Sequence, residues 1–362
     1  MYLSKRASIP TWKAWLIRIA AVVLALVLCG VVAFLLIEKL QKNPGKIGDF
    51  YYAFIKGAFS SPRRIWKFLK ELSVLLCIAL ALTPAFRMRF WNIGGEGQTL
   101  IGVLSAIAVA FYLGGKVPEW LLLILMLLAS LTAGAVWAVI PALFRAKWGT
   151  NETLFTLMMN YVATYVVSFF LIVWVPSGSS NLGKLKFGKL PAVVNDQLLT
   201  IIIVLLLTVG LFIYLNYTKQ GYEISVVGES VRTAQYVGIN EKKVIIRTMI
   251  LSGALCGMAG YLIAAGADQT VTTESAGGQG FTAILVAWLG KFNPLYMIVT
   301  AGLIQLLNTG AAQISQDFGV NNALPNVIIG IVLFFIIGSE FFINYKMNFR
   351  RHEQTAGKEA VK

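Results

Sequence analysis

Long uncharged apolar stretches alternate with shorter polar segments along the whole chain. Ten such stretches occur, at residues 19–37, 72–86, 99–115, 120–144, 154–175, 198–217, 248–267, 281–290, 295–314 and 323–339. A helix needs roughly 20 residues to cross the hydrocarbon of a bilayer, so most of these stretches predict membrane-spanning helices. The short ones, at 72–86 and 281–290, predict broken or re-entrant pieces.

Composition agrees with this pattern. Hydrophobic residues make up 57% of the chain and charged residues 13%, and the mean hydropathy is +0.74. These values predict an all-α polytopic membrane protein with about ten transmembrane helices. The net charge of +15 lies in loops and tails between the apolar stretches, so it gives no reason to expect a nucleic-acid partner. We expect the lipid membrane to be the partner of the apolar stretches.

The distribution of charge predicts the topology. With ten spans and both termini in the cytoplasm, the inner segments hold the larger share of Lys and Arg, as the positive-inside tendency requires. The segment 39–71 does not follow this rule, because it is rich in Lys and Arg and yet the predicted topology places it on the outer side of the membrane. We interpret residues 47–59, together with Trp66 and Phe68, as an amphipathic element at the interface.

These features divide the chain into six predicted regions. They are a cytoplasmic anchor with the first span (1–38), a basic interfacial segment (39–71), a first helical half (72–217), a cytoplasmic loop (218–247), a second half (248–345) and a basic cytoplasmic tail (346–362).

The loop 218–247 is the longest polar segment between two twenty-residue apolar stretches. Residues 229–238 contain good helix formers and end at Gly238, which can adopt the left-handed conformation that stops a helix. We therefore predict a short surface helix here. Val231, Ala234 and Val237 would share one side of it and form a small apolar face with charged margins. The alternative is a solvated loop helix that binds nothing.

Two glycine-rich breaks precede short apolar stretches, one in each half. Gly94, Gly95 and Gly97 surround Glu96, and a second cluster at 277–280 surrounds Gln279. Each half later contains a similar string, G-T-N-E-T-L from Gly149 and G-V-N-N-A-L from Gly319. The topology places the first break nearer the inner side and the second nearer the outer side. This predicts inverted pseudo-repeats with interrupted helices and a solute route between the halves.

Polar side chains near these breaks are expensive in lipid, so they need a partner or a cavity. Asn160 lies well inside a predicted span, where its amide must find a partner. Asn151 is a reasonable cap for the helix that follows it, and Glu152 suits that helix's first turn. Glu96 has an alternative explanation, in which it pairs with Arg87 or Arg89 within tight glycine-mediated packing.

Three strings resemble a known family. The string F-W-N-I-G-G-E-G-Q, from Phe90, is similar to the N-I-G-x-E-G-Q signature of permease subunits of ABC importers that carry nucleosides and related sugars. The string G-T-N-E-x-x-x-T-L-M-x-N, from Gly149, resembles the same branch. The string G-E-S-x-R-T-A-x-x-x-G-I-N, from Gly228, resembles the cytoplasmic coupling loop of such permeases. The resemblance covers about residues 70–345 and belongs to the branched-chain amino acid, simple-sugar and nucleoside permease superfamily.

The resemblance implies partners and roles. A permease of this kind, in the bacterial cytoplasmic membrane, pairs with a second permease (identical or homologous), with ABC ATPase subunits inside and with a substrate-binding lipoprotein or periplasmic protein outside. The residues expected to couple to the ATPase are Gly228, Glu229, Arg232, Ala234, Gly238 and Ile239. The residues expected along the substrate pathway are Trp91, Asn92, Glu96, Gln98, Asn160, Gln279 and Phe281. Trp91 and Phe281 offer ring faces on which a base could stack.

Missing motifs limit the chemistry. None of the Gly-Lys pairs completes the phosphate-binding pattern G-x-x-x-x-G-K-[ST], so we expect ATP and Mg²⁺ on a partner ATPase and no cofactor here. The sequence shows no nucleophile with a base, no metal cluster and no catalytic histidine, and it does not favour an enzyme. The alternatives are a simple-sugar (ribose-like) ABC permease, an ion-coupled secondary transporter, and a scaffold or channel.

Overall fold

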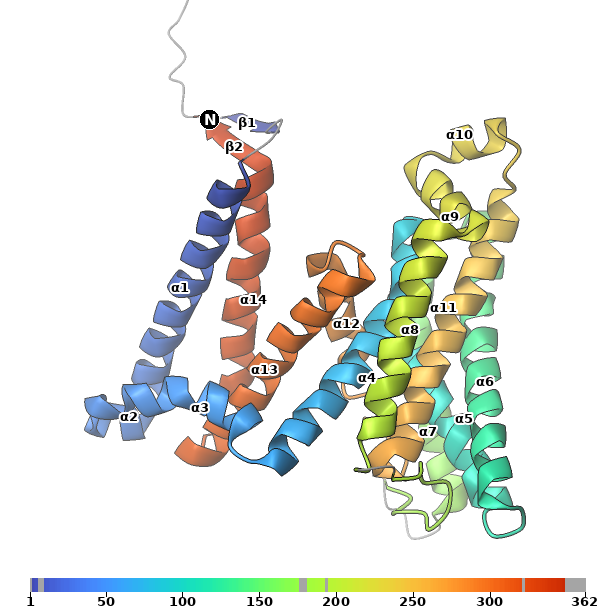
Figure 1. Ribbon diagram of the computed structural model, residues 1–362, viewed down its shortest axis with the longest axis horizontal. Coiled ribbons are helices and arrows are strands. Elements are labelled where there is room, and N and C mark those ends of the chain that lie inside the picture. Colours follow the sequence, from blue (N-terminus) through green and yellow to red (C-terminus); the bar gives the residue numbers. More distant parts are fainter. Residues whose placement is uncertain (1, 6–9, 176–180, 193–194, 321–322, 349–362) are drawn as a thin grey trace, which may run out of the picture. The chain divides into compact units, whose positions relative to one another are not determined.

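The structure is a computed structural model, and it describes residues 2–5, 10–175, 181–192, 195–320 and 323–348 (Figure 1). Its helices form two compact units. One unit joins Met1–Ala58 to Leu307–Lys362, and the other comprises Phe59–Leu306.

The first unit is built from both ends of the chain. Its elements are α1 (Thr11–Leu36), α2 (Glu38–Lys42), the 3₁₀ turn η1 (Pro44–Lys46), α3 (Ile47–Phe59), the end of α13 (Pro294–Phe318) and α14 (Ala323–Asn344). Strand β1 (Tyr2–Lys5) pairs antiparallel with β2 (Tyr345–Asn348). Arg18 of α1 forms an ion pair with Glu340 of α14 at 2.6 Å, and the two helices lie side by side (Figure 1).

Helix α3 has the bounds expected for the amphipathic element, residues 47–59. Phe50, Ala53 and Phe54 are buried on one side, whereas Tyr52 and Ile55 are exposed on the other. The spacing of three and four between buried positions is that of an amphipathic helix. Its place at a membrane interface stays a prediction.

The second unit contains most of the helices. They are α4 (Pro62–Arg87), α5 (Gly95–Leu113), α6 (Glu119–Trp148), α7 (Glu152–Trp174), α8 (Leu198–Tyr217), α9 (Lys219–Glu229), α10 (Val231–Tyr236), α11 (Glu241–Ile263), a π turn η2 (Ala264–Asp268), α12 (Gln279–Leu289) and the start of α13. Helix α11 packs against α4, α5 and α6.

Small residues allow α11 to approach its neighbours closely. A Cβ atom at Gly253 would overlap the carbonyl of Gly134 on α6, and one at Gly257 would overlap the carbonyl of Ser130. The Ser130 hydroxyl lies 2.6 Å from the Gly257 carbonyl and 2.8 Å from that of Gly102 on α5. Such contacts replace the hydrophobic driving force that is missing between helices in lipid.

The structure confirms an all-α polytopic membrane protein, and it leaves the count of ten crossings open. Seven helices of the described residues are long and apolar enough to cross a bilayer, and two shorter apolar stretches are α12 and residues Val327–Ile343 within α14. The expected short span at 72–86 is wrong in its length. It is the second part of α4, a 26-residue helix whose first turns carry Arg63, Arg64 and Lys67. Those charges hid the first half of the helix from the apolar pattern.

The internal repeat appears in the order of the helices. Gly149 follows α6 and Gly319 follows α13, with φ of 66° and 68°. Both glycines stop a long helix in the left-handed conformation just before the next helix begins. The pair Asn321 and Asn322 of the second string lies outside the described residues.

Candidate functional site

The two glycine-rich breaks are entered from opposite ends of the second unit. After α4, the chain turns at Arg89 (φ 58°) beside Gly228 of α9 and then enters α5. After α11 and η2, the carbonyl of Gln269 accepts the Leu185 N–H at 2.9 Å, in the segment between α7 and α8. Figure 1 shows α9 at one end of this unit and the α7–α8 segment at the other.

The breaks meet at Glu96, which lies in the first turn of α5. Its carboxylate oxygens accept the N–H of Gly278 at 2.7 Å and the N–H of Gly280 at 2.7 Å, at the start of α12. We call Glu96, Gly278 and Gly280 the junction. The two breaks, which the topology places nearer opposite sides of the membrane, are therefore in direct contact, and the chain approaches them from opposite ends of the unit.

Glycine makes this contact possible. A Cβ atom at Gly280 would lie 2.5 Å from Glu96 Cα and 2.8 Å from Glu96 Oε2. The alternative pairing of Glu96 with Arg87 or Arg89 is wrong for the described residues: the contacts of its carboxylate are the Gly278 and Gly280 N–H groups, and Arg87 instead donates to the Asn216 side chain at 3.3 Å. Two N–H donors satisfy the carboxylate without a second charge.

Asn92 and Gln98 bind each other across the first break. Gln98 Nε2 donates to Asn92 Oδ1 at 3.1 Å, and Asn92 Nδ2 donates to Gln98 Oε1 at 3.3 Å and to Ser252 Oγ of α11 at 3.1 Å. Both side chains are buried, with exposed fractions of 0% and 1%. In this conformation they hold the start of α5 in place. Their part in a substrate pathway stays a prediction.

Asn160 finds its partners on the same break. Its Oδ1 accepts the Gly97 N–H at 2.9 Å, and its Nδ2 donates to the Ile93 carbonyl at 3.0 Å. This confirms that the amide within α7 needs a partner and identifies it. A backbone that leaves helical geometry inside a membrane must find such hydrogen bonds outside its own helix.

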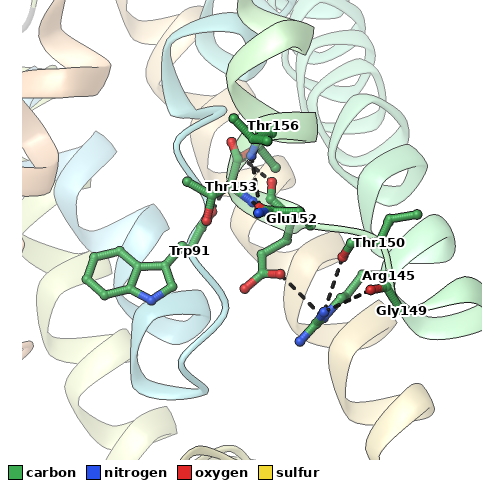
Figure 2. Close-up of polar contacts among 9 residues, drawn as sticks. Trp91, Arg145, Gly149, Thr150, Glu152, Thr153 and Thr156 are labelled. Atoms are coloured by element: carbon green, nitrogen blue, oxygen red, sulfur yellow. Dashed lines mark hydrogen bonds and ion pairs between the residues drawn. The ribbon is translucent and has the colours of Figure 1, made fainter.

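Thr156 completes the support of this segment, and the sequence reasoning missed it. Its Oγ1 accepts the Ile93 N–H at 3.1 Å and lies 3.4 Å from the Trp91 carbonyl, while it donates to Glu152 O at 2.7 Å (Figure 2). The spacing Thr156 and Asn160, four residues apart on α7, was a usable signal because it places both on one side of the helix.

The corner between α6 and α7 is fixed by charge and capping. Arg145 Nε lies 3.4 Å from the Glu152 carboxylate, and its Nη1 donates to the carbonyls of Gly149 and Thr150 at 3.2 Å each (Figure 2). Asn151 caps α7 as expected, accepting the Thr153 N–H at 3.0 Å. The string from Gly149 thus has a structural role at the start of α7, the helix that supports the first break.

Trp91 and Phe281 are the most exposed members of the predicted pathway, and Glu96 and Gln279 are partly exposed. Trp91 is 49% exposed and Phe281 43% exposed, so both rings have free faces. The two rings do not contact each other among the described residues. Trp91 instead packs edge-on against Phe86, with the ring centroids 5.7 Å apart. Gln279 is partly exposed, but its Oε1 atom is buried without a hydrogen-bond partner in the described part of the chain.

The predicted surface helix at 229–238 is present with a shifted start. Glu229 ends α9, and Ser230 caps α10 by accepting the Thr233 N–H at 3.3 Å. Gly238 adopts the expected left-handed conformation, with φ of 78°. The helix starts later because Ser230, with ψ of 120°, interrupts the run.

Most of α10 is exposed. Ala234 is fully buried, but Val231 is 44% and Val237 55% exposed, so the three do not form one exposed face. Tyr236, which the sequence reasoning missed, is 94% exposed. Arg232 is also exposed. The outer surface of α10 therefore joins apolar, aromatic and basic side chains.

A comparison with known protein families covers both the exposed helix α10 and the buried junction. A family model described as the branched-chain amino acid transport system permease component matches residues 64–337. The chain belongs to this permease family. The prediction from the three strings is confirmed at the level of the family, and the match includes both breaks and α10.

Relatives of the permease have several named substrates. A glucose ABC transporter permease of Haloferax volcanii is 29% identical, over 96% of this chain and 93% of the relative. A guanosine ABC transporter permease of Bacillus subtilis is 28% identical, over 81% and 86%. A nucleoside ABC transporter permease of Lactococcus lactis is 28% identical, over 77% and 80%.

One cavity of the permease lies away from the junction. It has a volume of about 430 Å³ and is formed by α4, α8 and α11, with Cys77, Leu207, Gly210 and Tyr214 in its wall. Its lining is almost entirely apolar, which does not suit a polar solute. We therefore place the candidate site at the junction and not in this cavity.

Proposed function

We propose that this chain is the membrane-spanning subunit of an ATP-driven ABC importer that carries nucleosides across the bacterial cytoplasmic membrane by alternating access. ATP and Mg²⁺ bind to a separate ATPase, and this chain hydrolyses nothing. The observation that carries the proposal is the exposed α10, which is joined through α9 to the chain entering the junction.

Force on α10 has a short path to the first break. Gly228, one residue before the end of α9, lies so close to the Arg87 carbonyl that a Cβ atom there would overlap it. Arg87 ends α4, and the glycine-rich break begins seven residues later, at Gly94. Glu223 of α9 forms an ion pair with Arg247 of α11 at 2.9 Å. A push on α10 would thus move the ends of α4 and α11 together, as a rigid-body rearrangement requires.

The coupling surface is built on the six residues expected from the resemblance, of which Gly228 and Ala234 are buried beneath it, with the exposed Tyr236 added. Ala234 and Gly238 shape the short helix: the Ala234 carbonyl accepts the Ile239 N–H at 2.8 Å, which closes the turn after α10. Glu229 and Arg232 are exposed and supply opposite charges. Exposed aromatic and Arg side chains are typical of the centre of a protein interface.

The solute route runs beside the junction. Trp91 and Phe281 offer ring faces, and Gln279 offers an amide, while Asn92, Gln98 and Asn160 hold the backbone that lines the route. Neutral polar groups with aromatic faces suit a nucleoside, whose base stacks and whose sugar hydroxyls form hydrogen bonds. The guanosine and nucleoside permeases among the relatives support this substrate class.

A sugar is the second candidate substrate. The glucose permease relative aligns with 96% of this chain, against 81% for the guanosine permease and 77% for the nucleoside permease, and this wider alignment favours a simple-sugar importer. An ion-coupled secondary transporter would also have broken helices, but it would have no need of an exposed helix such as α10 to receive a soluble ATPase.

The working complex includes further chains. We propose two permease subunits (identical or homologous), ABC ATPase subunits on the α10 side, and a binding protein (a lipoprotein or a periplasmic protein) on the opposite side. We also propose that both termini lie in the cytoplasm, as the distribution of Lys and Arg along the sequence predicts.

Reconstitution tests the proposal. The chain is placed in liposomes with the ATPase and binding protein encoded beside it, and uptake of labelled nucleosides and labelled glucose is measured. ATP-dependent nucleoside uptake is the expected result. Preference for glucose would establish the sugar alternative, and uptake that persists without ATP while an ion gradient is intact would establish a secondary carrier.

A further inference from the structure

The junction brings the N-termini of two interrupted helices together. Glu96 lies in the first turn of α5, and its carboxylate accepts two N–H groups at the start of α12. The N-terminus of a helix carries roughly half a positive charge. Two such ends amount to about one positive charge, which a single carboxylate offsets.

The other N–H groups at the start of α5 bind neutral acceptors. The Gly94 N–H donates to Asn92 Oδ1 at 3.1 Å, and the Gly97 N–H donates to Asn160 Oδ1 at 2.9 Å. Glu96 is therefore the charged acceptor among these contacts. No Lys or Arg side chain pairs with it among the described residues.

Interrupted helices in transporters commonly aim their N-termini at the anionic group of a substrate. Here that position is taken by a carboxylate of the chain itself. We propose that Glu96 is an internal counter-anion that makes the route selective for uncharged solutes and excludes anions such as nucleotides and sugar phosphates. This proposal rests on the proposed function, since it defines the charge of the solute that the importer carries.

The exposure of the side chains agrees with this role. Glu96 is partly exposed, whereas Gly95 and Gly97 on either side of it are buried, so part of this residue reaches accessible space while both carboxylate oxygens bind the N–H groups of α12. Gln279, between the two glycines that Glu96 binds, has a side-chain oxygen without a partner among the described residues. The negative charge of Glu96 would repel an anion that came near the junction, whereas a neutral nucleoside or sugar carries no charge to be repelled.

A purely structural clamp is the competing explanation, and a rescue experiment separates the two. The full-length chain is purified as wild type and as Glu96→Ala, and its melting temperature is measured in sodium formate, in sodium chloride and with formamide. Formate supplies a carboxylate to the vacated N–H groups. Formamide is close to formate in size and carries no charge, and its single carbonyl acceptor can bind one of the vacated N–H groups where formate binds two.

We expect formate to raise the melting temperature of Glu96→Ala by about 2–4 °C over chloride, while formamide does not. The matched control is Asp49→Ala, which removes an exposed carboxylate from the first turn of α3 and should respond like the wild type. Glu96→Asp keeps the charge and should also show no formate effect.

Equal stabilisation of Glu96→Ala by formate and formamide, or by neither, would overturn the proposal in favour of a clamp without a charge role. If Glu96→Ala cannot be purified in chloride, its recovery in formate but not in formamide is the expected result. Equal loss in all three conditions overturns it.

Transport supplies a second measurement. Inhibition of nucleoside uptake by a nucleoside monophosphate should increase roughly 2- to 30-fold in Glu96→Gln compared with the wild type. The formate experiment needs no transport, so a wild-type complex that imports neither nucleosides nor sugars would reject the proposed function and leave the charge inference standing.

Discussion

The polar side chains at the junction bind one another, whereas those of α10 are exposed. At the junction, Glu96 and its neighbours bind one another, and Asn92 and Gln98 have almost no exposed surface. On α10, only Ala234 is buried, and Arg232 and Tyr236 face outward. Side chains of the first region hold an irregular backbone in place, whereas those of the second are available to another protein.

This difference indicates that the stability of the fold and the coupling to a partner protein depend on different regions of the chain. An unsatisfied polar group inside the hydrocarbon costs several kcal/mol, so the break tolerates little change. Exposed substitutions away from special features usually change stability by about ±0.5 kcal/mol or less. Substitutions in the two regions should therefore fail in different assays.

The largest expected effect is that of Asn160→Leu. It removes both partners that α7 supplies to the break, the acceptor for the Gly97 N–H and the donor to the Ile93 carbonyl. Each unsatisfied buried group costs about 1–3 kcal/mol, so we expect loss of both folded protein and uptake. Thermal unfolding in detergent measures the first. Asn151→Leu, at the exposed cap of α7, is the milder control, and equal destabilisation by the two would contradict the role of Asn160.

Arg232→Glu should abolish ATP-dependent uptake and leave the protein in the membrane, because it reverses the charge of the proposed ATPase contact without touching a buried group. Uptake and membrane content are measured together. Lys116→Glu makes the same charge reversal on an exposed residue at the other end of the unit and should transport normally. Normal uptake by Arg232→Glu would remove α10 from the coupling surface.

Gln98→Leu is expected to have the smallest effect. It removes one partner of Asn92 and should change the affinity for solute roughly 2- to 13-fold while ATPase docking is unchanged. Ser252→Ala removes another partner of Asn92, on α11, and should lower stability without changing solute preference. Unchanged binding and transport across nucleosides in Gln98→Leu would exclude it from the route.

Periodicity and local chemistry predicted much of this structure. Helix α3, the Asn151 cap, the Gly238 stop and the need of Asn160 for a partner all depend on short-range geometry, which the sequence contains. The length of α4 was missed because Arg63 and Arg64 interrupt the apolar pattern without ending the helix. The start of α10 was missed because Ser230 serves as a cap within what reads as one helix.

The contact between the two breaks was beyond sequence reasoning. Glu96 and Gly278 are separated by 182 residues, and nothing in their spacing states that they meet. An arginine at Arg87 or Arg89 was the nearer choice by sequence distance. The structure instead satisfies the carboxylate with backbone N–H groups, which a side-chain pattern does not reveal.

The small sheet at the chain's two ends constrains how often the polypeptide passes through the bilayer. Strand β1 precedes α1 and strand β2 follows α14, and Tyr2 pairs with Asn348. Ends that share hydrogen bonds must emerge on one face of the membrane, so the number of passes is even. Within the part of the chain that the structure describes, seven helices are long and apolar enough to cross, which is an odd number, and therefore at least one of the shorter or more charged helices must complete a crossing.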